Sequence, residues 1–249
     1  MNSWIVRYQP NPQACLRLFC YPYAGAGASI FQSWSSQLPA AIEVCSVQLP
    51  GRERRFREPL FTDLPSLIEA LTPALLPHLD LPFAFFGHSV GALISFETAR
   101  QLRRSHYPSP LHLFVSGRSA PQISALKPPI HHLPDAQLVE KLREYNGTPT
   151  AVLENAELMS LFLPILRADL AINETYVYDR DLPLACPISA FGGLNDEIAS
   201  PDAIAAWREQ TCDRFAFQMF PGDHFFLKSQ QAELLQAIAL ELLQIVRKI

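Results

Sequence analysis

Short apolar runs alternate with longer amphipathic segments along most of this chain. In residues 62–79, for example, leucine and isoleucine recur at steps of three and four residues, as in a helix. Short buried strands that alternate with helices are typical of a parallel sheet covered on both faces. The pattern therefore predicts an α/β fold with a mostly parallel central sheet flanked by helices. Strands are expected at 16–20, 43–49, 82–86, 111–116, 188–191 and 214–220, and helices at 29–38, 62–79, 90–104 and 230–246.

The alternation breaks between residues 127 and 181, where no strand pattern occurs. Residues 133–145 and 154–176 both have helical character, and Pro134 and Asp135 suit the start of a helix. Helices inserted before the sheet resumes predict a lid over the carboxyl ends of the strands. The alternative is ordinary crossover packing. We expect one domain over residues 1–249, with the helical lid at 127–181 inserted within it.

Composition places the chain among ordinary globular proteins. It has 249 residues, of which 49% are hydrophobic and 18% charged, and its net charge of −4 offers no general attraction for nucleic acid or anionic lipid. No signal peptide or membrane span is visible, so a soluble cytoplasmic protein is expected. The five cysteines include no C-x-x-C pair. Cys20, Cys45 and Cys186 lie in or beside apolar runs, which predicts buried thiols in a reducing compartment.

A candidate nucleophile lies between an expected strand and an expected helix. Residues 87–91 read Gly-His-Ser-Val-Gly, which is the G-x-S-x-G pattern of a sharp strand-to-helix turn. Such a turn exposes the Ser89 hydroxyl and leaves the Val90 N–H free to stabilise an oxyanion. His88 adjoins the serine, but adjacent residues in a tight turn point apart. We expect His88 to pack or to hydrogen-bond beneath the turn.

The base and the acid of a catalytic triad are expected in the two loops that follow the last strands. Chain order in α/β-hydrolases is serine, then acid, then histidine. His224 lies between the last strand and the last helix, and Asp196 follows the preceding strand just after two glycines. Asp196 would orient the imidazole and stabilise its charged form. Glu197 remains the rival acid, and Asp223 is expected to cap the turn before His224.

The second oxyanion donor is expected in the loop after the first strand. Residues 21–28 read Tyr-Pro-Tyr-Ala-Gly-Ala-Gly-Ala, and their small side chains let the backbone approach a reacting carbonyl. The N–H of Ala24 or of Gly25 is the candidate. The loop lacks the G-x-G-x-x-G spacing and a P-loop lysine, and His131 and His132 lack a third ligand. No nucleotide, metal or other cofactor is therefore expected.

With these residues placed, the sequence resembles the type II thioesterases, the stand-alone editing enzymes of polyketide and nonribosomal peptide synthesis. The resemblance covers nearly the whole chain. The pattern Q-L-P-G-R-E-x-R and the pattern G-D-H-F-F-L, in this order, are more specific than G-x-S-x-G alone. The matching segments are residues 21–25, 48–55, 86–92, 116–121, 192–196 and 222–227.

The resemblance implies an α/β-hydrolase fold and hydrolysis of acyl thioesters on the 4′-phosphopantetheine arm of acyl or peptidyl carrier proteins. Misprimed or stalled acyl groups would be removed and the free thiol restored. The family's triad falls on Ser89, Asp196 and His224, and its oxyanion donors on the N–H groups of Ala24 and Val90. Its lid would be the helical insertion. A monomer is the default expectation.

Four arginines between residues 52 and 57 form a basic segment in an otherwise acidic chain. Because carrier proteins are usually acidic and pantetheine carries a phosphate, Arg52, Arg54 and Arg55 are candidates for carrier docking. The alternative is a solvated charged loop.

The same triad would also serve other acyl hydrolases. A medium-chain fatty-acyl carrier-protein thioesterase and an oxoester hydrolase are the enzymatic alternatives, because the motif does not define the leaving group. A carrier-binding protein on an inactive hydrolase fold is disfavoured, since no triad member is missing. The sequence does not reveal the acyl group or the pathway.

Overall fold

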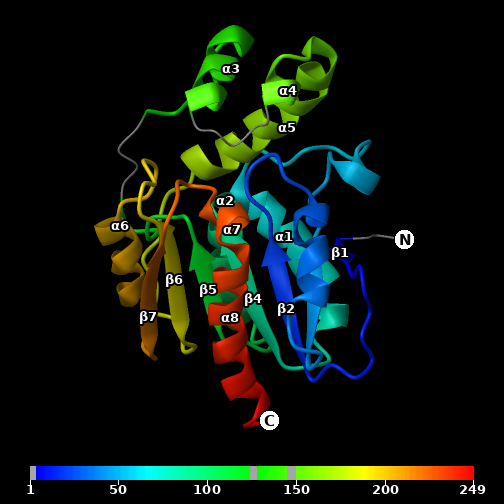
Figure 1. Ribbon diagram of the computed structural model, residues 1–249, viewed down its shortest axis with the longest axis vertical. Helices are drawn as coiled ribbons and strands as arrows, with labels where there is room; N and C mark the ends of the chain where they lie inside the picture. The colour runs from blue at the N-terminus through cyan, green and yellow to red at the C-terminus, as the bar shows by residue number, and fades with distance from the viewer. Residues whose placement is uncertain (1–3, 124–127, 145–149) are drawn as a thin grey trace.

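A seven-stranded sheet forms the centre of the computed structural model, which describes residues 4–123, 128–144 and 150–249 (Figure 1). The strand order is β1-β3-β2-β4-β5-β6-β7, and every pair is parallel except β1 with β3. The mostly parallel sheet is as predicted. The strands are β1 Ile5–Val6, β2 Leu16–Tyr21, β3 Ile42–Val47, β4 Phe83–His88, β5 Leu113–Ser116, β6 Ile188–Gly193 and β7 Phe215–Phe220.

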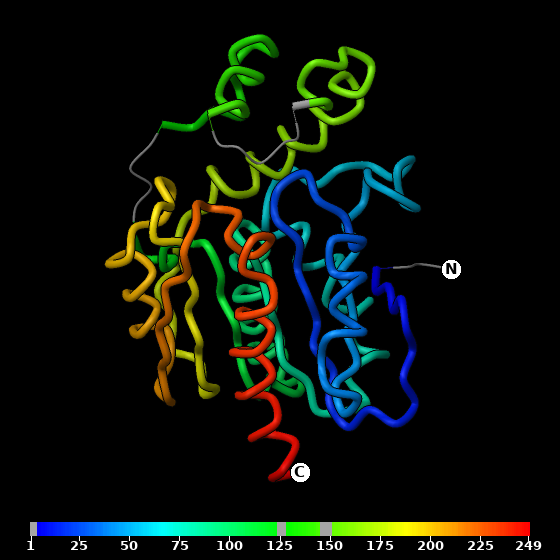
Figure 2. The backbone as a smooth tube through the Cα atoms, viewed as in Figure 1, coloured from blue at the N-terminus to red at the C-terminus, as the bar shows by residue number. Residues whose placement is uncertain are grey.

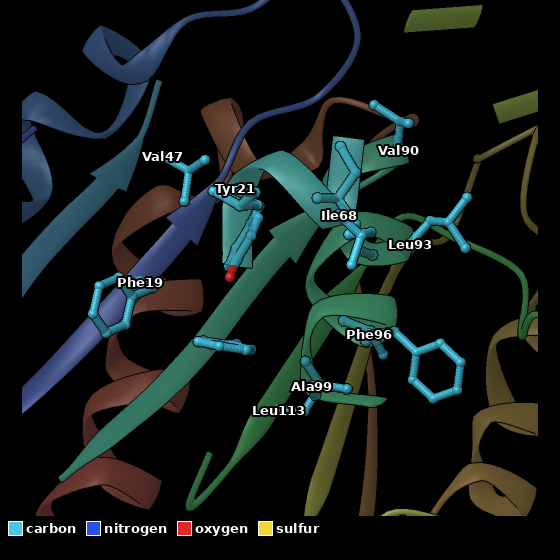
Figure 3. Packing of buried hydrophobic residues seen from close by; sticks show 14 of the residues in the cluster. Phe19, Tyr21, Val47, Ile68, Val90, Leu93, Phe96, Ala99 and Leu113 are labelled. Atoms are coloured by element: carbon cyan, nitrogen blue, oxygen red, sulfur yellow. The ribbon is translucent and has the colours of Figure 1, made fainter. Parts of the chain in front are cut away.

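Helices cover both faces of this sheet and produce two separate cores. On one face, α1 (Leu64–Leu75) and α2 (Val90–Arg104) pack on the strands, and Figure 3 shows Phe19 and Tyr21 of β2 in the same cluster as Phe96 of α2. On the other face, α8 (Gln231–Val246) and the 3₁₀ helix η1 (Ala28–Ser36) bury their apolar sides. The central strands β2 to β6 are buried at every position, as their continuous apolar runs predict.

Several elements differ from the sequence-based expectation. Residues 28–36 form a 3₁₀ helix in place of an α-helix, and the expected helix 62–79 ends at Leu75, where the 3₁₀ turn η3 (Leu76–His78) takes over. Short elements were not predicted, because two to five residues carry too little periodicity to read. They are β1, η2 (Glu53–Arg55), α6 (Pro201–Ala205), η4 (Ala206–Gln210) and α7 (Phe226–Ser229).

The helical insertion consists of α3 (Asp135–Glu144), α4 (Thr150–Leu153) and α5 (Ala156–Glu174). These helices lie beyond the carboxyl ends of the strands, at the end of the molecule opposite the C-terminus (Figure 2). They share a small apolar cluster of their own, which includes Leu138, Leu142 and Leu163. The expected helices are confirmed, while Lys127 and Tyr145, at the ends of two expected ranges, lie outside the described residues.

The cysteines also follow the expectation. Cys20, Cys45 and Cys186 are buried and free, and burial raises the pKa of Cys45 and of Cys186 to about 12. The remaining thiols, Cys15 and Cys212, are exposed. Across the part of the chain that the structure describes, no helix is long and apolar enough to cross a membrane.

Candidate active site

Ser89 lies on a strained turn between β4 and α2. Its φ of 55° and ψ of −121° are rare for a residue with a side chain, and its N–H is tied to the Ser116 carbonyl oxygen at 2.8 Å. A Cβ at Gly87 would lie 2.2 Å from the Gly91 oxygen, and a Cβ at Gly91 would lie 2.2 Å from the Tyr21 oxygen. Both glycines are therefore required by close backbone approach, which explains the G-x-S-x-G spacing.

Asp196 and His224 form a buried pair beyond the ends of β6 and β7. The His224 Nδ1 lies 2.8 Å from Asp196 Oδ2, and the two side chains are 7% and 0% exposed. The second carboxylate oxygen accepts the N–H groups of Ile198 at 2.8 Å and Ala199 at 3.2 Å. Asp196 is held from both sides, so it can orient the imidazole and leave Nε2 free to exchange a proton.

Backbone hydrogen bonds hold the acid loop and the base loop together. The Leu194 N–H donates to the Phe220 oxygen at 2.8 Å, and the Asn195 N–H donates to the Gly222 oxygen at 2.9 Å. At Gly193 a Cβ would lie only 2.3 Å from the Asp223 oxygen, so glycine permits this approach. Asp223 itself accepts the N–H of the residue after His224 and so caps the turn, as expected.

His88 lies beneath the turn, in agreement with the sequence-based expectation. Its Nδ1 lies 2.9 Å from the Ser116 hydroxyl, and its ring is fully buried. Burial, assisted by the positive field of His224, depresses the pKa of His88 well below its ordinary value. The neutral ring packs 5.2 Å from the His224 ring, centroid to centroid, and this contact places His224 beside the residue that precedes Ser89.

The loop after β2 distinguishes between the two candidate oxyanion donors. The Gly25 N–H is occupied, because it donates to Asp169 Oδ2 at 2.7 Å. The N–H groups of Ala24 and Val90 have no acceptor among the residues that the structure describes. Of the two candidates, Ala24 is therefore the one whose N–H is unoccupied among the described residues.

Two of the three arginines expected to dock a carrier protein are buried. Arg52 is only 5% exposed and pairs with Asp169, and Arg55 is 4% exposed and donates to the Gln48 oxygen at 2.9 Å. Arg55 also stacks over the Trp4 ring, 3.9 Å from its centroid. Guanidinium groups tolerate burial when carboxylates and carbonyls receive their N–H groups. Only Arg54 of the three candidates is exposed.

Asp169 is the residue of this site that the sequence-based reading missed. It lies on α5, is 2% exposed, and contacts both the loop after β2 and Arg52. A lone acid on the apolar face of the helix at 154–176 is a readable signal, because a buried carboxylate needs a cationic partner. The sequence does not identify which arginine is the partner of Asp169.

A mostly parallel sheet with a strained serine after β4, an acid after β6 and a histidine after β7 is the α/β-hydrolase fold. The chain belongs to the Thioesterase domain family, whose match spans residues 16–241. It is therefore an enzyme of the thioester-hydrolysing class.

Three known proteins show how similar its relatives are. Gramicidin S biosynthesis protein GrsT of Aneurinibacillus migulanus is 50% identical over 242 residues, which cover 97% of this chain and 94% of that protein. The medium-chain S-acyl fatty acid synthase thioesterase of Rattus norvegicus is 35% identical over 226 residues, covering 90% and 86%. The solved structure of BorB, a type II thioesterase from the borrelidin biosynthetic cluster, superimposes with a TM-score of 0.88 at 36% identity, covering 96% and 97%. The resemblance to type II thioesterases is confirmed.

Proposed function

We propose that this thioesterase removes misprimed or stalled acyl groups from the 4′-phosphopantetheine arm of acyl and peptidyl carrier proteins. The observation that carries the proposal is the 2.8 Å contact of His224 with the buried Asp196, beside the strained turn that bears Ser89. The 50% identity to a protein of gramicidin S biosynthesis supports a carrier-bound substrate. Ser89, Asp196 and His224 come from one chain, which suits a monomer, and five free cysteines suit the reducing cytoplasm.

The site residues have separate roles in this reaction. The Ser89 hydroxyl attacks the thioester carbonyl carbon while His224 Nε2 takes its proton, and Asp196 stabilises the imidazolium. The N–H groups of Ala24 and Val90 stabilise the oxyanion of the tetrahedral intermediate. Collapse of the intermediate breaks the carbon–sulfur bond, and His224 returns the proton to the pantetheine thiolate. Water, activated by the same histidine, then releases the acid from the serine.

The insertion between residues 127 and 181 would act as a lid in this scheme. Its described helices lie beyond the carboxyl ends of the strands, where Ser89, Asp196 and His224 also lie. Their shared apolar cluster, with Leu163 and Leu166 on α5, places hydrophobic side chains on this side of the molecule. A lid of this kind would exclude bulk water from the acyl-enzyme and accommodate the acyl chain.

A panel of acyl-loaded carrier proteins tests the proposed substrate. We expect slow hydrolysis over a broad range of short acyl groups, from acetyl upward, because an editing enzyme must accept many wrong groups. The measurement is the rate of acyl release from carrier proteins that differ only in acyl length, with the matching oxoesters as controls. The 35% identity to a medium-chain thioesterase favours one alternative: a sharp preference for decanoyl over acetyl would replace editing with chain-length-specific release. Faster oxoester turnover would contradict a thioester substrate.

Carrier docking is proposed for the exposed part of the basic segment only. Arg54 and Arg57 are exposed and flank Phe56, whose side chain is 49% exposed. Two exposed cations beside an exposed apolar ring suit an acidic partner with an apolar contact surface. This replaces the original candidate set, from which Arg52 and Arg55 are removed by burial.

Charge reversal tests this docking surface. We expect the Arg54→Glu, Arg57→Glu double variant to raise KM for acyl carrier protein severalfold, because like charges would now face an acidic partner. KM for a small acyl-N-acetylcysteamine thioester should not change. Arg247→Glu, an exposed arginine after α8, is the matched control and should leave both values unchanged. Equal effects on both substrates, or none on either, would remove the docking role.

A further inference from the structure

A buried ion pair connects the loop after β3 with the helical insertion. Arg52 Nη1 lies 2.6 Å from Asp169 Oδ2, and Nη2 lies 2.8 Å from Oδ1, so the contact is bidentate. Both side chains are at least 95% buried. Arg52 also donates to the Ala26 oxygen at 3.2 Å and to the Pro50 oxygen at 3.3 Å. Removing two charges from water is costly, so a buried ion pair by itself contributes little to stability.

Asp169 has a third contact that points to a specific use. Its Oδ2 receives the Gly25 N–H at 2.7 Å, in addition to Arg52. Nearby, Gln48 receives the Ala28 N–H at 2.9 Å, and Glu53 receives the Ser29 N–H at 3.1 Å. Side-chain acceptors thus take the N–H of Gly25 and the first two N–H groups of η1, while the Ala24 N–H has no acceptor among the described residues. Most of these acceptors, and Arg52 itself, come from the Q-L-P-G-R-E segment that carries the family resemblance.

The turn that bears Ala24 has two possible orientations of its central peptide. The Ala26 N–H donates to the Tyr23 oxygen at 3.0 Å, and Gly25 has a φ of +78°, which matches a type II turn. In this orientation the Gly25 N–H faces Asp169. A flipped peptide would instead point the Ala24 carbonyl oxygen toward the carboxylate, which is repulsive. Asp169 therefore selects one form of the turn, with its ψ at Ala24 and its φ at Gly25, and so holds Ala24 and the peptide before it in place.

The α5 helix also restricts the same turn by direct packing. A Cβ at Gly25 would lie 2.5 Å from Leu166 Cδ2, so the backbone is in close contact with the helix that carries Asp169. Arg52 balances the carboxylate charge, since an unpaired anion here would oppose the oxyanion that forms during catalysis. The ion pair can thus orient a donor without adding net negative charge beside the reacting carbonyl.

We propose that Asp169, held by Arg52, is a positioning residue for the oxyanion hole and ties the geometry of the Ala24 N–H to helix α5. The proposal rests on the proposed function, because it assumes that Ala24 stabilises the oxyanion at Ser89. Asp169 does not contact the reacting atoms. Its effect is transmitted through the turn at Gly25.

The chain contains a matched control for this ion pair. Arg17 and Glu43 form a second buried contact, with Nε 2.8 Å from Oε2 and exposures of 9% and 2% for the side chains. Arg17 is the second residue of β2 and Glu43 the second residue of β3, so this pair lies at the amino ends of the strands. A loss of activity caused merely by breaking a buried ion pair should follow substitution of either pair. A loss of oxyanion stabilisation should follow only substitution of the Arg52–Asp169 pair.

The test compares Asp169→Leu, which removes the acceptor of the Gly25 N–H, with Glu43→Leu, and the Arg52→Met, Asp169→Leu double variant with Arg17→Met, Glu43→Leu. Apolar replacement of a whole pair often preserves folding, so the double variants remain informative if a single variant unfolds. Deleting an oxyanion donor typically costs ~10²–10³-fold in rate, and a displaced donor should cost about 10–100-fold. We expect kcat for an acyl-N-acetylcysteamine thioester to fall by that factor at Asp169, with KM within about twofold. The Arg17 and Glu43 variants should keep kcat within about twofold.

A second readout separates positioning from general damage. A hexyl trifluoromethyl ketone forms a charged tetrahedral adduct with the nucleophilic serine, while the matching trifluoromethyl alcohol cannot be attacked. In the Asp169 variants, the affinity for the ketone should fall by the same factor as kcat falls. Their affinity for the alcohol should not change. Equal loss for both ligands, or unchanged kcat and ketone affinity in folded Asp169 variants, would overturn the proposal.

The ketone readout also distinguishes the two proposals from each other. Adduct formation requires Ser89 and the oxyanion hole but not a particular substrate. If the wild-type protein forms the adduct yet hydrolyses no carrier-bound thioester, the proposed function fails while the role of Asp169 is still decided by the variants. If the wild type edits carriers and the Asp169 variants edit equally well, the positioning role alone fails.

Discussion

Replacing Ser89 with alanine should lower the hydrolysis of a carrier-bound acyl thioester by ~10⁶-fold, because the triad acts as a unit and has no other nucleophile. The fold should survive, since the strained turn is held by the Ser89 backbone N–H and by the two glycines that flank it, not by the hydroxyl. The measurement is single-turnover release of a radiolabelled acyl group, with thermal melting to check the fold.

Ser95→Ala is the matched control for this variant. Ser95 lies on α2, the helix that follows Ser89, and its hydroxyl donates to the Ala92 oxygen at 2.9 Å. It should retain wild-type turnover and should still react with a fluorophosphonate probe, whereas Ser89→Ala should lose both. Undiminished hydrolysis by Ser89→Ala would mean that the chemistry proceeds elsewhere, and the mechanism proposed above would have to be abandoned.

Replacing Asp196 with asparagine should lower kcat by ~10⁴-fold with little change in stability. The amide oxygen can still accept the N–H groups of Ile198 and Ala199, so the loop keeps its conformation. The amide nitrogen would then face His224 Nδ1 and donate a hydrogen bond to it, which leaves Nδ1 unprotonated and puts the ring proton on Nε2. A base in this tautomer cannot take the proton of the Ser89 hydroxyl. Steady-state kinetics on acyl-N-acetylcysteamine check the result.

The neighbouring acid provides the control for Asp196. Glu197 is exposed, and no ion pair engages it within the described ranges 4–123, 128–144 and 150–249. Glu197→Gln should therefore keep full activity. The opposite result, with an inactive Glu197→Gln variant and an active Asp196→Asn variant, would mean that Glu197 and not Asp196 is the acid of the triad.

Local sequence is enough for strands β2 to β7 of the sheet and for the turn at Ser89. The buried strands are continuous apolar runs, and the helices between them show a period near 3.6, so their existence and order follow from periodicity. Gly87 and Gly91 identify the turn because only glycine fits where a Cβ would meet backbone at 2.2 Å. Asp196 and His224 follow from chain order once the strands are placed, because parallel strands bring the loops after them to one edge of the sheet.

Contacts between distant segments are what the tertiary structure alone decided. Arg52 and Asp169 are 117 residues apart, and no local pattern distinguishes a buried paired arginine from a solvated one. The same contact selects Ala24 over Gly25 as the free donor, because Asp169 occupies the Gly25 N–H. Periodicity reports which face of an element is apolar. It does not report which polar groups on different elements meet, since that depends on how the elements pack and on which buried charges must be neutralised.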